Sequence, residues 1–370
     1  MRVAIIHYWL VGMRGGEKVL EALCNMFPNA DIYTHVYDPS AISGVIKSHR
    51  ISTTFINRLP FATKMYKRYL PLMPMALEQL DLSGYDLVIS SESGPAKGII
   101  PTSPAVHICY CHSPMRYIWN MYNKYYESSG LMTRMMMPPL AHYLRTWDVA
   151  TSNRVDGFVA NSATVANRIK SYYRRESDII HPPVDTQAFR PVPTRDVEDY
   201  FLMVGELVSY KRPDLAVEAF NRMKAKLIVI GGGEMLHHLR KIAGPTVSIL
   251  GAQPFDVLRH HYARCKALIF PGEEDFGIVP LEAMASGRPV IAFGRGGATE
   301  TVVANKTGVF FEMQTVEAII DSVEKWQKID FDPSDAVARA AQFRTDVFID
   351  KFSAYVSKSI GGSLMRAQAS

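Results

Sequence analysis

Cysteine is scarce in this sequence of 370 residues, and long apolar runs are missing from it. The cysteines, Cys24, Cys109, Cys111 and Cys265, are too few and too irregularly spaced for a disulfide-stapled extracellular domain, and are typical of reduced thiols in the cytosol. The most apolar stretch, residues 131–144, is interrupted by charge and proline, so no run reaches the roughly 18 residues of a transmembrane helix. The opening residues are too short for the core of a signal peptide, and we therefore expect a cytoplasmic protein.

Three further absences each argue against a class of protein. The formal net charge of +5 is mild, and no dense run of lysine and arginine is interleaved with aromatic residues, so nucleic acid is not an expected partner. A dehydrogenase would need a Gly-x-Gly-x-x-Gly turn after a strand and an acid about 20 residues later, and this pair is missing. His107, Cys109 and Cys111 fall on one face of a predicted strand, but no second cluster completes a four-ligand metal site. We therefore predict no bound metal.

What the sequence does contain is an alternation of short apolar runs with helical patterns. The runs, such as residues 226–233 and 289–294, are rich in valine and isoleucine, as in strands buried on both faces of a parallel sheet. We predict an α/β fold of two doubly wound, Rossmann-like domains. The proline-rich residues 182–196 lack periodicity and form the linker, so the domains extend over 1–190 and 191–345.

A short helix is predicted within residues 273–302. Pro280 suits its first position, where a missing N–H costs nothing. Gly287 fits just past its last turn, where a positive φ is needed. Glu282 then lies in the first turn of this helix, and Glu274 lies in the loop before it.

The beginning of this predicted helix is suited to bind a sugar that carries phosphate. The free N–H groups of Phe276, Gly277 and Ile278 can face an anion. The carboxylates of Glu274 and Glu282 can accept hydrogen bonds from hydroxyl groups. Either acid alone would suit the solvated end of a helix, but the ordered combination favours a nucleotide sugar.

These two glutamates, separated by seven residues, resemble the donor site of a large family of retaining glycosyltransferases that includes bacterial mannosyltransferases, glycosyltransferase family 4 (group 1). The resemblance implies the GT-B fold, in which two Rossmann-like domains face a central cleft. The first domain, on the acceptor side, would be joined by the last helix, residues 346–359. Glu274 would bind and orient the transferred sugar, and Glu282 would bind the ribose hydroxyls.

In the first domain the resemblance covers a glycine-rich turn and the stretch CHSPMRYIW. Gly15 and Gly16 follow the first predicted strand, where they would approach the donor phosphates; a simple tight turn is the alternative. His112 matches the family's histidine that contacts the transferred sugar. Arg116 would meet phosphate or acceptor, and residues 91–93 would line the same cleft.

In the second domain the resemblance covers the phosphate side of the donor site. Gly205 ends a predicted strand, and Lys211 matches the family's lysine that holds the diphosphate. Glu206 stands where the family has arginine, so Arg212 would supply the second positive charge. Gly232 lies in a triple-glycine turn that resembles the one on which the base or ribose packs.

The implied activity is transfer of a hexose, first of all mannose from GDP-mannose, with retention of configuration. Rhamnose, glucose or galactose from other nucleotides are alternatives, and a non-catalytic sugar-binding partner of a glycosylation complex is another. The acceptor would be a glycan or a lipid-linked saccharide in polysaccharide biosynthesis. No cofactor is expected. Asp330 and Asp332 have the spelling of a metal-binding pair, but they lie in a polar loop before Pro333, which favours a solvated approach to a helix.

Residues 57–74 mix basic side chains with aromatic and aliphatic ones. Such a mixture suits a helix that lies on a lipid surface. A helix packed on the first domain with a solvated basic face is the alternative. Because similar enzymes extend lipid-linked acceptors, we expect peripheral contact with the inner face of the cytoplasmic membrane.

Overall fold

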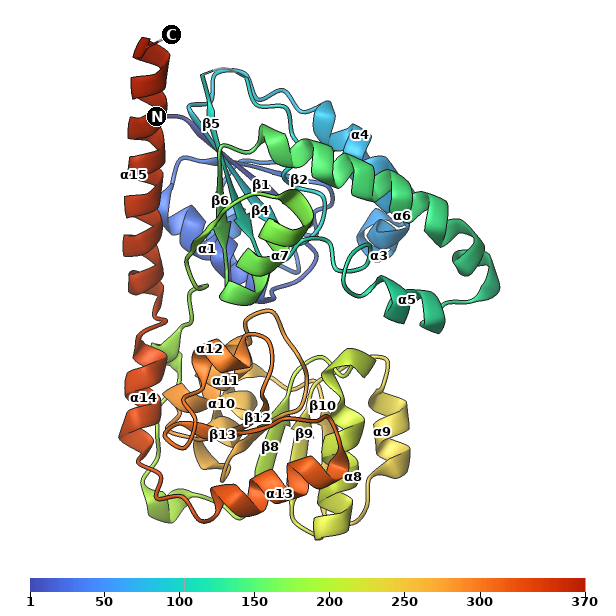
Figure 1. The fold of residues 1–370 in the computed structure, drawn as a ribbon, viewed down its shortest axis with the longest axis vertical. Helices are drawn as coiled ribbons and strands as arrows, with labels where there is room; N and C mark the ends of the chain where they lie inside the picture. Colours follow the sequence, from blue (N-terminus) through green and yellow to red (C-terminus); the bar gives the residue numbers. More distant parts are fainter. Residues whose placement is uncertain (103, 370) are drawn as a thin grey trace. The chain divides into compact units, whose positions relative to one another are not determined.

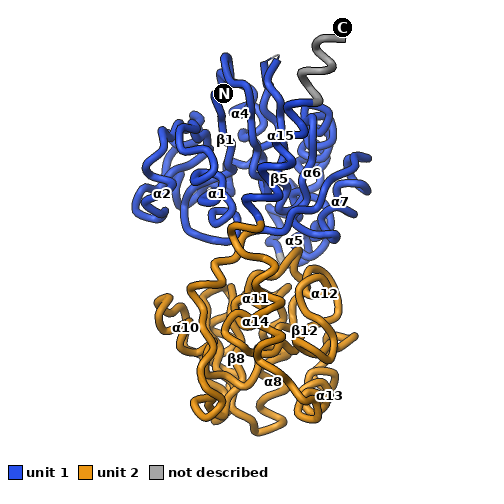
Figure 2. Tube along the Cα trace, turned by 90° about the vertical axis from the view of Figure 1, so that its left-hand side faces the viewer, with its two compact units in different colours: residues 1–182, 348–370 blue, residues 183–347 orange. Residues whose placement is uncertain are grey.

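The computed structural model describes residues 1–102 and 104–369, which form two compact units. The first unit comprises residues 1–182 and 348–370, and the second comprises 183–347 (Figure 2). The chain thus leaves the first unit at residue 182, where the sequence had suggested a boundary at 190.

The first unit is built on a seven-stranded sheet in which every pair of neighbouring strands is parallel. Its order is β3-β2-β1-β4-β5-β6-β7, so the winding direction reverses between β1 and β4. The strands are β1 (Val3–His7), β2 (Asp31–Thr34), β3 (Ile51–Thr53), β4 (Leu87–Glu92), β5 (Val106–Cys111), β6 (Gly157–Ala160) and β7 (Asp178–Ile179). All residues of β1, β4 and β5 are buried, as strands covered by helices on both faces must be.

Helices cover both faces of this sheet (Figure 1). Alternate residues point to opposite faces: Ile5 packs in one core with α1 and α15, whereas Ile6 packs in another with α4. The helices are α1 (Gly15–Met26), α2 (Gly44–Lys47), η1 (Phe55–Arg58), α3 (Ala62–Met65), η2 (Tyr66–Leu72), α4 (Met73–Glu78), α5 (Tyr122–Ser128), α6 (Leu131–Thr151), η3 (Ser152–Arg154) and α7 (Ala163–Tyr173).

The last helix, α15 (Thr345–Ala369), belongs mostly to the first unit. Phe348, Phe352 and Val356 are buried in the core that also contains Tyr110 of β5. Both phenylalanine rings contact the ring of Tyr110 edge-on. The helix is longer than the predicted residues 346–359.

The basic segment is not one helix, and this part of the prediction is wrong. It is divided among η1, α3 and η2. Phe61 adopts the left-handed conformation, with φ of 51°, and Pro71 lies inside the 3₁₀ helix η2. Exposed basic and aromatic side chains nevertheless occur together here, as the prediction required. They are Arg58, Phe61, Lys64, Lys67 and Arg68.

The second unit contains a six-stranded parallel sheet of order β10-β9-β8-β11-β12-β13. The strands are β8 (Phe201–Val204), β9 (Leu227–Ile230), β10 (Val247–Gly251), β11 (Leu268–Phe270), β12 (Val290–Phe293) and β13 (Gly308–Phe311). The helices are η4 (Thr186–Ala188), η5 (Thr194–Asp196), η6 (Ser209–Lys211), α8 (Pro213–Met223), α9 (Leu236–Ile242), α10 (Phe255–Arg264), α11 (Ile278–Ala285), α12 (Ala298–Thr301), α13 (Val316–Trp326) and α14 (Pro333–Ala341).

Two apolar cores sandwich this second sheet. Leu202 and Leu268 pack with α10, α11 and α14 on one face, whereas Met203 and Ile269 pack with α8, α9 and α13 on the other. The winding direction reverses between β8 and β11. The predicted pair of doubly wound α/β domains is therefore confirmed.

Candidate active site

The predicted donor-site residues of the second unit gather where β8 and β11 end, at the point of winding reversal. Ligands of open parallel sheets bind beyond the carboxyl ends of strands at such a point. Lys211 ends η6, which follows β8, and Glu274 lies in the loop after β11. Lys211 Nζ lies 2.8 Å from Glu274 Oε1, with the two side chains only 16% and 20% exposed. Burial lowers the pKa of Lys211, but its contact with Glu274 and the charges of Tyr210 and Glu206 together outweigh burial, and the net shift is upward.

Glycines allow the loops around this pair to approach one another. Gly272 packs so closely that a Cβ there would lie 2.8 Å from Lys211 Cα. Gly205 has a φ of 147°, and a Cβ on Gly231 would overlap the carbonyl oxygen of Gly205. A Cβ on Gly232, by contrast, would lie 3.9 Å from Ala252 Cβ, an ordinary contact, and the carbonyl of Gly232 accepts the N–H of Leu207 at 2.8 Å. Gly232 is therefore less tightly enclosed than Gly231.

A second glycine turn, after β12, supports the loop that carries Glu274. The N–H of Gly297 donates to the carbonyl of Glu274 at 2.8 Å. A Cβ on Gly296 would overlap that same carbonyl, and one on Gly297 would overlap the backbone of Phe276. Phe276 is itself anchored in the apolar core, so the loop is held from both sides.

The helix α11 begins earlier than predicted. Gly277, with φ of 84°, is its N-cap, and Ile278 is its first residue. Pro280 is therefore the third helical residue rather than the first, and Glu282 is the fifth and lies beyond the first turn. The predicted ending is confirmed, because Gly287 follows the helix with φ of 70°.

Glu282 is held by a residue that the sequence analysis missed. The hydroxyl of Tyr262, on α10, donates to Glu282 Oε2 at 2.7 Å. Burial raises the pKa of Glu282 to about 7, against the opposing effect of that hydrogen bond. A tyrosine on an amphipathic helix gives no signal in the sequence, since core packing explains it equally well.

The side chain of Arg212 binds a neighbouring residue of its own segment, Asp214. Its guanidinium makes three hydrogen bonds of 3.0–3.2 Å to the carboxylate of Asp214, in the first turn of α8. Arg212 itself has φ of 51° and caps that helix. The side chain of Glu206 is exposed, and its charge contributes to the raised pKa of Lys211.

In the first unit, His112 lies directly after β5 and is joined to β4. The ring nitrogen Nε2 of His112 lies 2.8 Å from Ser91 Oγ, and the backbone N–H of His112 donates to the carbonyl of Glu92 at 2.8 Å. Burial, followed by the nearby His7, lowers the pKa of His112 to about 3, so the ring is neutral at ordinary pH. The sequence analysis missed His7, although a histidine at the end of a buried strand could have been singled out.

The glycine-rich turn of the first unit is more tightly packed than the resemblance suggested. Gly15 is the first residue of α1. A Cβ on Gly16 would overlap the hydroxyl of Tyr8, so Gly16 makes room for this side chain. Burial, followed by the charge of Glu17, raises the pKa of Tyr8.

Glu92 is engaged in a buried network and is not open to a ligand. It is fully buried and accepts two hydrogen bonds from Lys97, at 2.7 Å from the backbone N–H and 2.9 Å from Nζ. The Lys97 ammonium also donates to Asp148. Trp119 and Tyr173 donate to the other oxygen of Asp148, at 2.8 and 2.9 Å. This network ties the end of β4 to α6 and α7.

Two of the residues considered as metal ligands, His107 and Asp332, have structural partners. His107 contacts Ser90 Oγ at 2.8 Å and the carbonyl of Arg154 at 2.9 Å. Asp332 is the N-cap of α14 and accepts the N–H of Ser334 at 2.8 Å. Within the described ranges, no group of three or more histidine, cysteine, aspartate or glutamate side chains is arranged to hold a metal ion.

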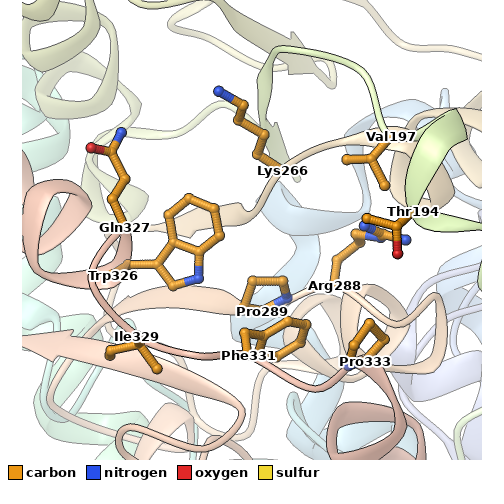
Figure 3. Close-up of a pocket in the computed structure, with 10 residues that line it drawn as sticks. All are labelled: Thr194, Val197, Lys266, Arg288, Pro289, Trp326, Gln327, Ile329, Phe331 and Pro333. Atoms are coloured by element: carbon orange, nitrogen blue, oxygen red, sulfur yellow. The ribbon is translucent and has the colours of Figure 1, made fainter.

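A cavity of about 430 Å³ lies at the opposite edge of the second sheet, where β11 and β12 begin (Figure 3). Trp326, Phe331 and Pro289 form apolar walls, and Arg288 and Lys266 extend in different directions from it. None of the predicted donor-site residues lines this cavity.

The two parallel α/β units have the fold of GT-B glycosyltransferases, as the solved structures that superimpose on them do. Residues 13–188 match the family described as Glycosyltransferase Family 4, and residues 185–343 match Glycosyl transferases group 1. The two matches together extend over most of both units. The chain belongs to this group 1/family 4 of glycosyltransferases.

Curated relatives and solved structures agree with this class. Over 213 residues the chain is 32% identical to a GDP-mannose-dependent alpha-(1-6)-phosphatidylinositol monomannoside mannosyltransferase of Mycobacterium tuberculosis, covering 48% of this chain and 55% of the relative. An alpha-1,3/1,6-mannosyltransferase of Neurospora crassa is 28% identical over 57% of this chain and 54% of its own. The chain thus spans about half the length of these relatives.

The fold comparison covers nearly the whole chain. Alr3699/HepE of Anabaena, solved with UDP and glucose, superimposes with a TM-score of 0.70 at 15% identity, over 96% of this chain and 99% of that one. Sucrose-phosphate synthase of Thermosynechococcus elongatus superimposes with a TM-score of 0.71 at 17% identity, over 98% of this chain and 100% of that one.

Proposed function

We propose that this protein transfers mannose from GDP-mannose to a saccharide or lipid-linked saccharide, with retention of configuration, in polysaccharide biosynthesis. Two relatives support the sugar, since both are named mannosyltransferases and the first is named GDP-mannose-dependent. The pairing of Lys211 with Glu274 supports the chemistry and carries the proposal.

The ion pair between Lys211 and Glu274 suits a site that binds a negatively charged donor. A partly buried ammonium and a partly buried carboxylate satisfy each other until a donor binds. A diphosphate that binds Lys211 replaces the carboxylate as its partner, and Glu274 then becomes available for sugar hydroxyls. The two residues thus divide the donor between them, phosphate to Lys211 and sugar to Glu274.

The remaining residues are assigned to parts of the same donor. The backbone around Phe276, Gly277 and Ile278 faces the diphosphate and, with Lys211, stabilises the leaving group as the sugar–phosphate bond breaks. Glu282 binds the ribose hydroxyls. Gly205 and Gly232 give the nucleotide access to the backbone, and Gly15 and Gly16 do the same near the phosphates. His112 contacts the transferred sugar.

Arg212 is assigned a weaker role than the sequence suggested. Its guanidinium is bound to Asp214, so it contributes to the diphosphate site only at the expense of that contact. Lys211 therefore carries most of the positive charge. We propose that the reaction needs no metal ion, since this cation and the N–H groups oppose the charge of the leaving group.

A UDP-sugar is the second candidate donor. The solved structure that contains UDP and glucose favours a UDP-sugar, although at 15% identity that similarity is evidence for the fold alone. A non-catalytic sugar-binding partner is a third reading, prompted by Glu206 in place of the family's arginine. Donor turnover by the purified protein separates this reading from the first two.

Thermal unfolding with GDP-mannose, UDP-glucose, ADP-glucose and dTDP-rhamnose tests the donor. Ligands that bind the native state raise the unfolding temperature. GDP-mannose should give the largest rise, and turnover should persist in EDTA. A larger rise with another donor overturns the mannose assignment, and activity that is lost in EDTA and restored by Mg²⁺ overturns metal independence.

Replacement of the first-unit histidine tests its assignment. His112→Ala should lower turnover of the nucleotide sugar while leaving affinity for free GDP unchanged, because the proposed partner of His112 is the sugar. Equal loss of both would show that His112 supports the fold or the nucleotide instead.

We also propose that the surface of residues 57–74 makes peripheral contact with an anionic membrane. Lys64, Lys67 and Arg68 are exposed there, and Phe61 is 73% exposed beside them. Among the described helices, none is long and apolar enough to cross a bilayer.

A further inference from the structure

The protonation pattern of His112 determines what this residue offers a ligand. A neutral imidazole donates from one nitrogen and accepts at the other. If His112 contacts a sugar hydroxyl, as the proposed function requires, the tautomer decides whether the ring accepts from that hydroxyl or donates to it. The surrounding side chains contain a device that selects one tautomer.

Ser91 Oγ bridges two histidine rings. It lies 2.8 Å from Nε2 of His112 and 3.0 Å from Nδ1 of His7. The sheet enforces this arrangement, because His7 ends β1 and is in register with Ser91 on the adjacent strand β4. His7 and Ser91 are both completely buried, so bulk water does not compete for these contacts.

Glu17, His7, Ser91 and His112 form a row of contacting side chains, and the buried carboxylate of Glu17 lies at the end opposite His112. Glu17 Oε1 is 3.6 Å from Nε2 of His7, and Glu17 Oε2 accepts the backbone N–H of Arg14 at 2.9 Å. The Glu17 side chain is 3% exposed. Burial raises the pKa of Glu17, but its contacts with His7 and with backbone N–H groups outweigh burial and the net shift is downward. Glu17 is therefore ionised.

From this row we infer that Glu17, His7 and Ser91 act as positioning residues that fix His112 with its proton on Nε2. A carboxylate repels the lone pair of an imidazole nitrogen and attracts an N–H, so a His7 ring that holds one proton carries it on Nε2, facing Glu17. Its bare Nδ1 then accepts the Ser91 hydroxyl. The oxygen of Ser91, having donated, accepts the Nε2–H of His112.

The consequence is that His112 Nδ1 has a free lone pair. His112 then acts as an acceptor for a hydroxyl of the bound sugar, and the low pKa of His112 keeps this lone pair unprotonated at ordinary pH. Glu17 thereby controls the ring through two hydrogen bonds without touching the donor. This inference rests on the proposed function for its ligand, but the tautomer itself is a property of the protein alone.

The variant Glu17→Gln reverses the row with little change of shape. The Arg14 N–H still requires an acceptor, so the amide oxygen of the new side chain takes that position and its NH₂ faces His7 Nε2. His7 must then accept at Nε2 and donate from Nδ1 to Ser91. Ser91 donates in turn to His112 Nε2, and the proton of His112 moves to Nδ1.

Nitrogen NMR of protein labelled with ¹⁵N-histidine reads the two tautomers directly. The experiment is done without ligand at about pH 8, well above the ordinary histidine pKa, and His112→Ala identifies the signals. His112 should carry its proton on Nε2 in the wild type and on Nδ1 in Glu17→Gln. A proton on Nδ1 in the wild type, or the same tautomer in both proteins, overturns the inference.

Ser91→Ala provides a second variant in case Glu17→Gln fails to fold. It removes the bridge but keeps both rings, so the fraction of His112 with its proton on Nε2 should fall to that of a free imidazole, and Ser91→Thr should restore it. An unchanged tautomer in Ser91→Ala also overturns the inference.

Kinetics then tests the link to the proposed reaction. Glu17→Gln should lower kcat about tenfold, the effect of one lost hydrogen bond in the transition state, with the KM for the donor little changed. If the tautomers are as inferred but His112→Ala retains full turnover, the proposed contact with sugar fails while the positioning device stands. If His112→Ala loses turnover but Glu17→Gln does not, the device has no catalytic consequence and its positioning role is refuted.

Discussion

The backbone N–H of Gly297 donates to the carbonyl oxygen of Glu274 at 2.8 Å, and Gly297 has no room for a side chain beside Phe276. The turn after β12 therefore fixes the position of the backbone in the loop after β11. This contact explains why two glycines follow a buried strand here. It also makes the position of the Glu274 carboxylate depend on a residue outside the donor site.

The first prediction follows from this packing. Gly297→Ala should displace the loop at Phe276 and weaken binding of GDP-mannose about tenfold or more, since a displaced carboxylate loses its hydrogen bonds to sugar hydroxyls. Gly44→Ala is the matched control, because nothing lies within 4 Å of its Cβ position. Isothermal titration calorimetry measures both. Equal affinity in the two variants would show that the turn does not control the loop.

A second prediction concerns pH. The folded protein raises the pKa of Glu282 to about 7, above its ordinary value near 4.5, so the native state binds more protons than the unfolded state between these values. The contribution of Glu282 to stability is thus fully present below about pH 4.5 and is lost as the pH rises through about 7.

Urea unfolding of the wild type and Glu282→Gln at several pH values measures this contribution. The wild type should lose about 1–3 kcal/mol relative to the variant between pH 5 and 8. The neutral amide of the variant cannot ionise and serves as the reference. Parallel curves for the two proteins would mean that Glu282 titrates normally.

The third prediction concerns the membrane surface. Each basic residue near an anionic bilayer contributes about 1 kcal/mol. Replacing Lys64, Lys67 and Arg68 together by alanine should therefore reduce affinity for anionic liposomes about 100-fold. Activity on a soluble acceptor should survive, since these three exposed side chains are not among the residues assigned to the donor.

Liposome co-sedimentation provides the measurement for this surface. Alanine replacement of Lys241, Lys325 and Lys328, which are exposed on the second unit, makes the same change in net charge. This control should sediment like the wild type. If both triple variants lose binding alike, net charge and not residues 57–74 governs the contact.

The sheets could be predicted from the sequence because their strands are short apolar runs buried on both faces. β9 and β12, for example, lie within the predicted runs at 226–233 and 289–294. The strand β3 was missed, because its residues Ile51–Thr53 are only partly buried and lack an apolar run. The basic segment was predicted as one helix, but Phe61, in the left-handed conformation, interrupts it.

The residues of the candidate site were easier to predict than their partners. Glu274 was expected at the sugar and Lys211 at the diphosphate of one donor, but their direct contact depends on the backbone approach of Gly272, which only the folded loops reveal. The binding of Arg212 to Asp214 and of Tyr262 to Glu282 depends on rotamers and helix positions. Periodicity does not determine these features.

The central claim is that Lys211 and Glu274 divide a sugar nucleotide between them, and calorimetric titration of GDP and of GDP-mannose tests it most directly. Lys211→Met should weaken binding of both ligands by a factor of about 10–100, since a hydrogen bond to a charged group contributes about 1.5–3 kcal/mol. Glu274→Gln should weaken only GDP-mannose, and should leave GDP bound as tightly as before or more tightly. Equal affinity of Glu274→Gln and wild type for GDP-mannose, or undiminished binding of GDP by Lys211→Met, would contradict the account.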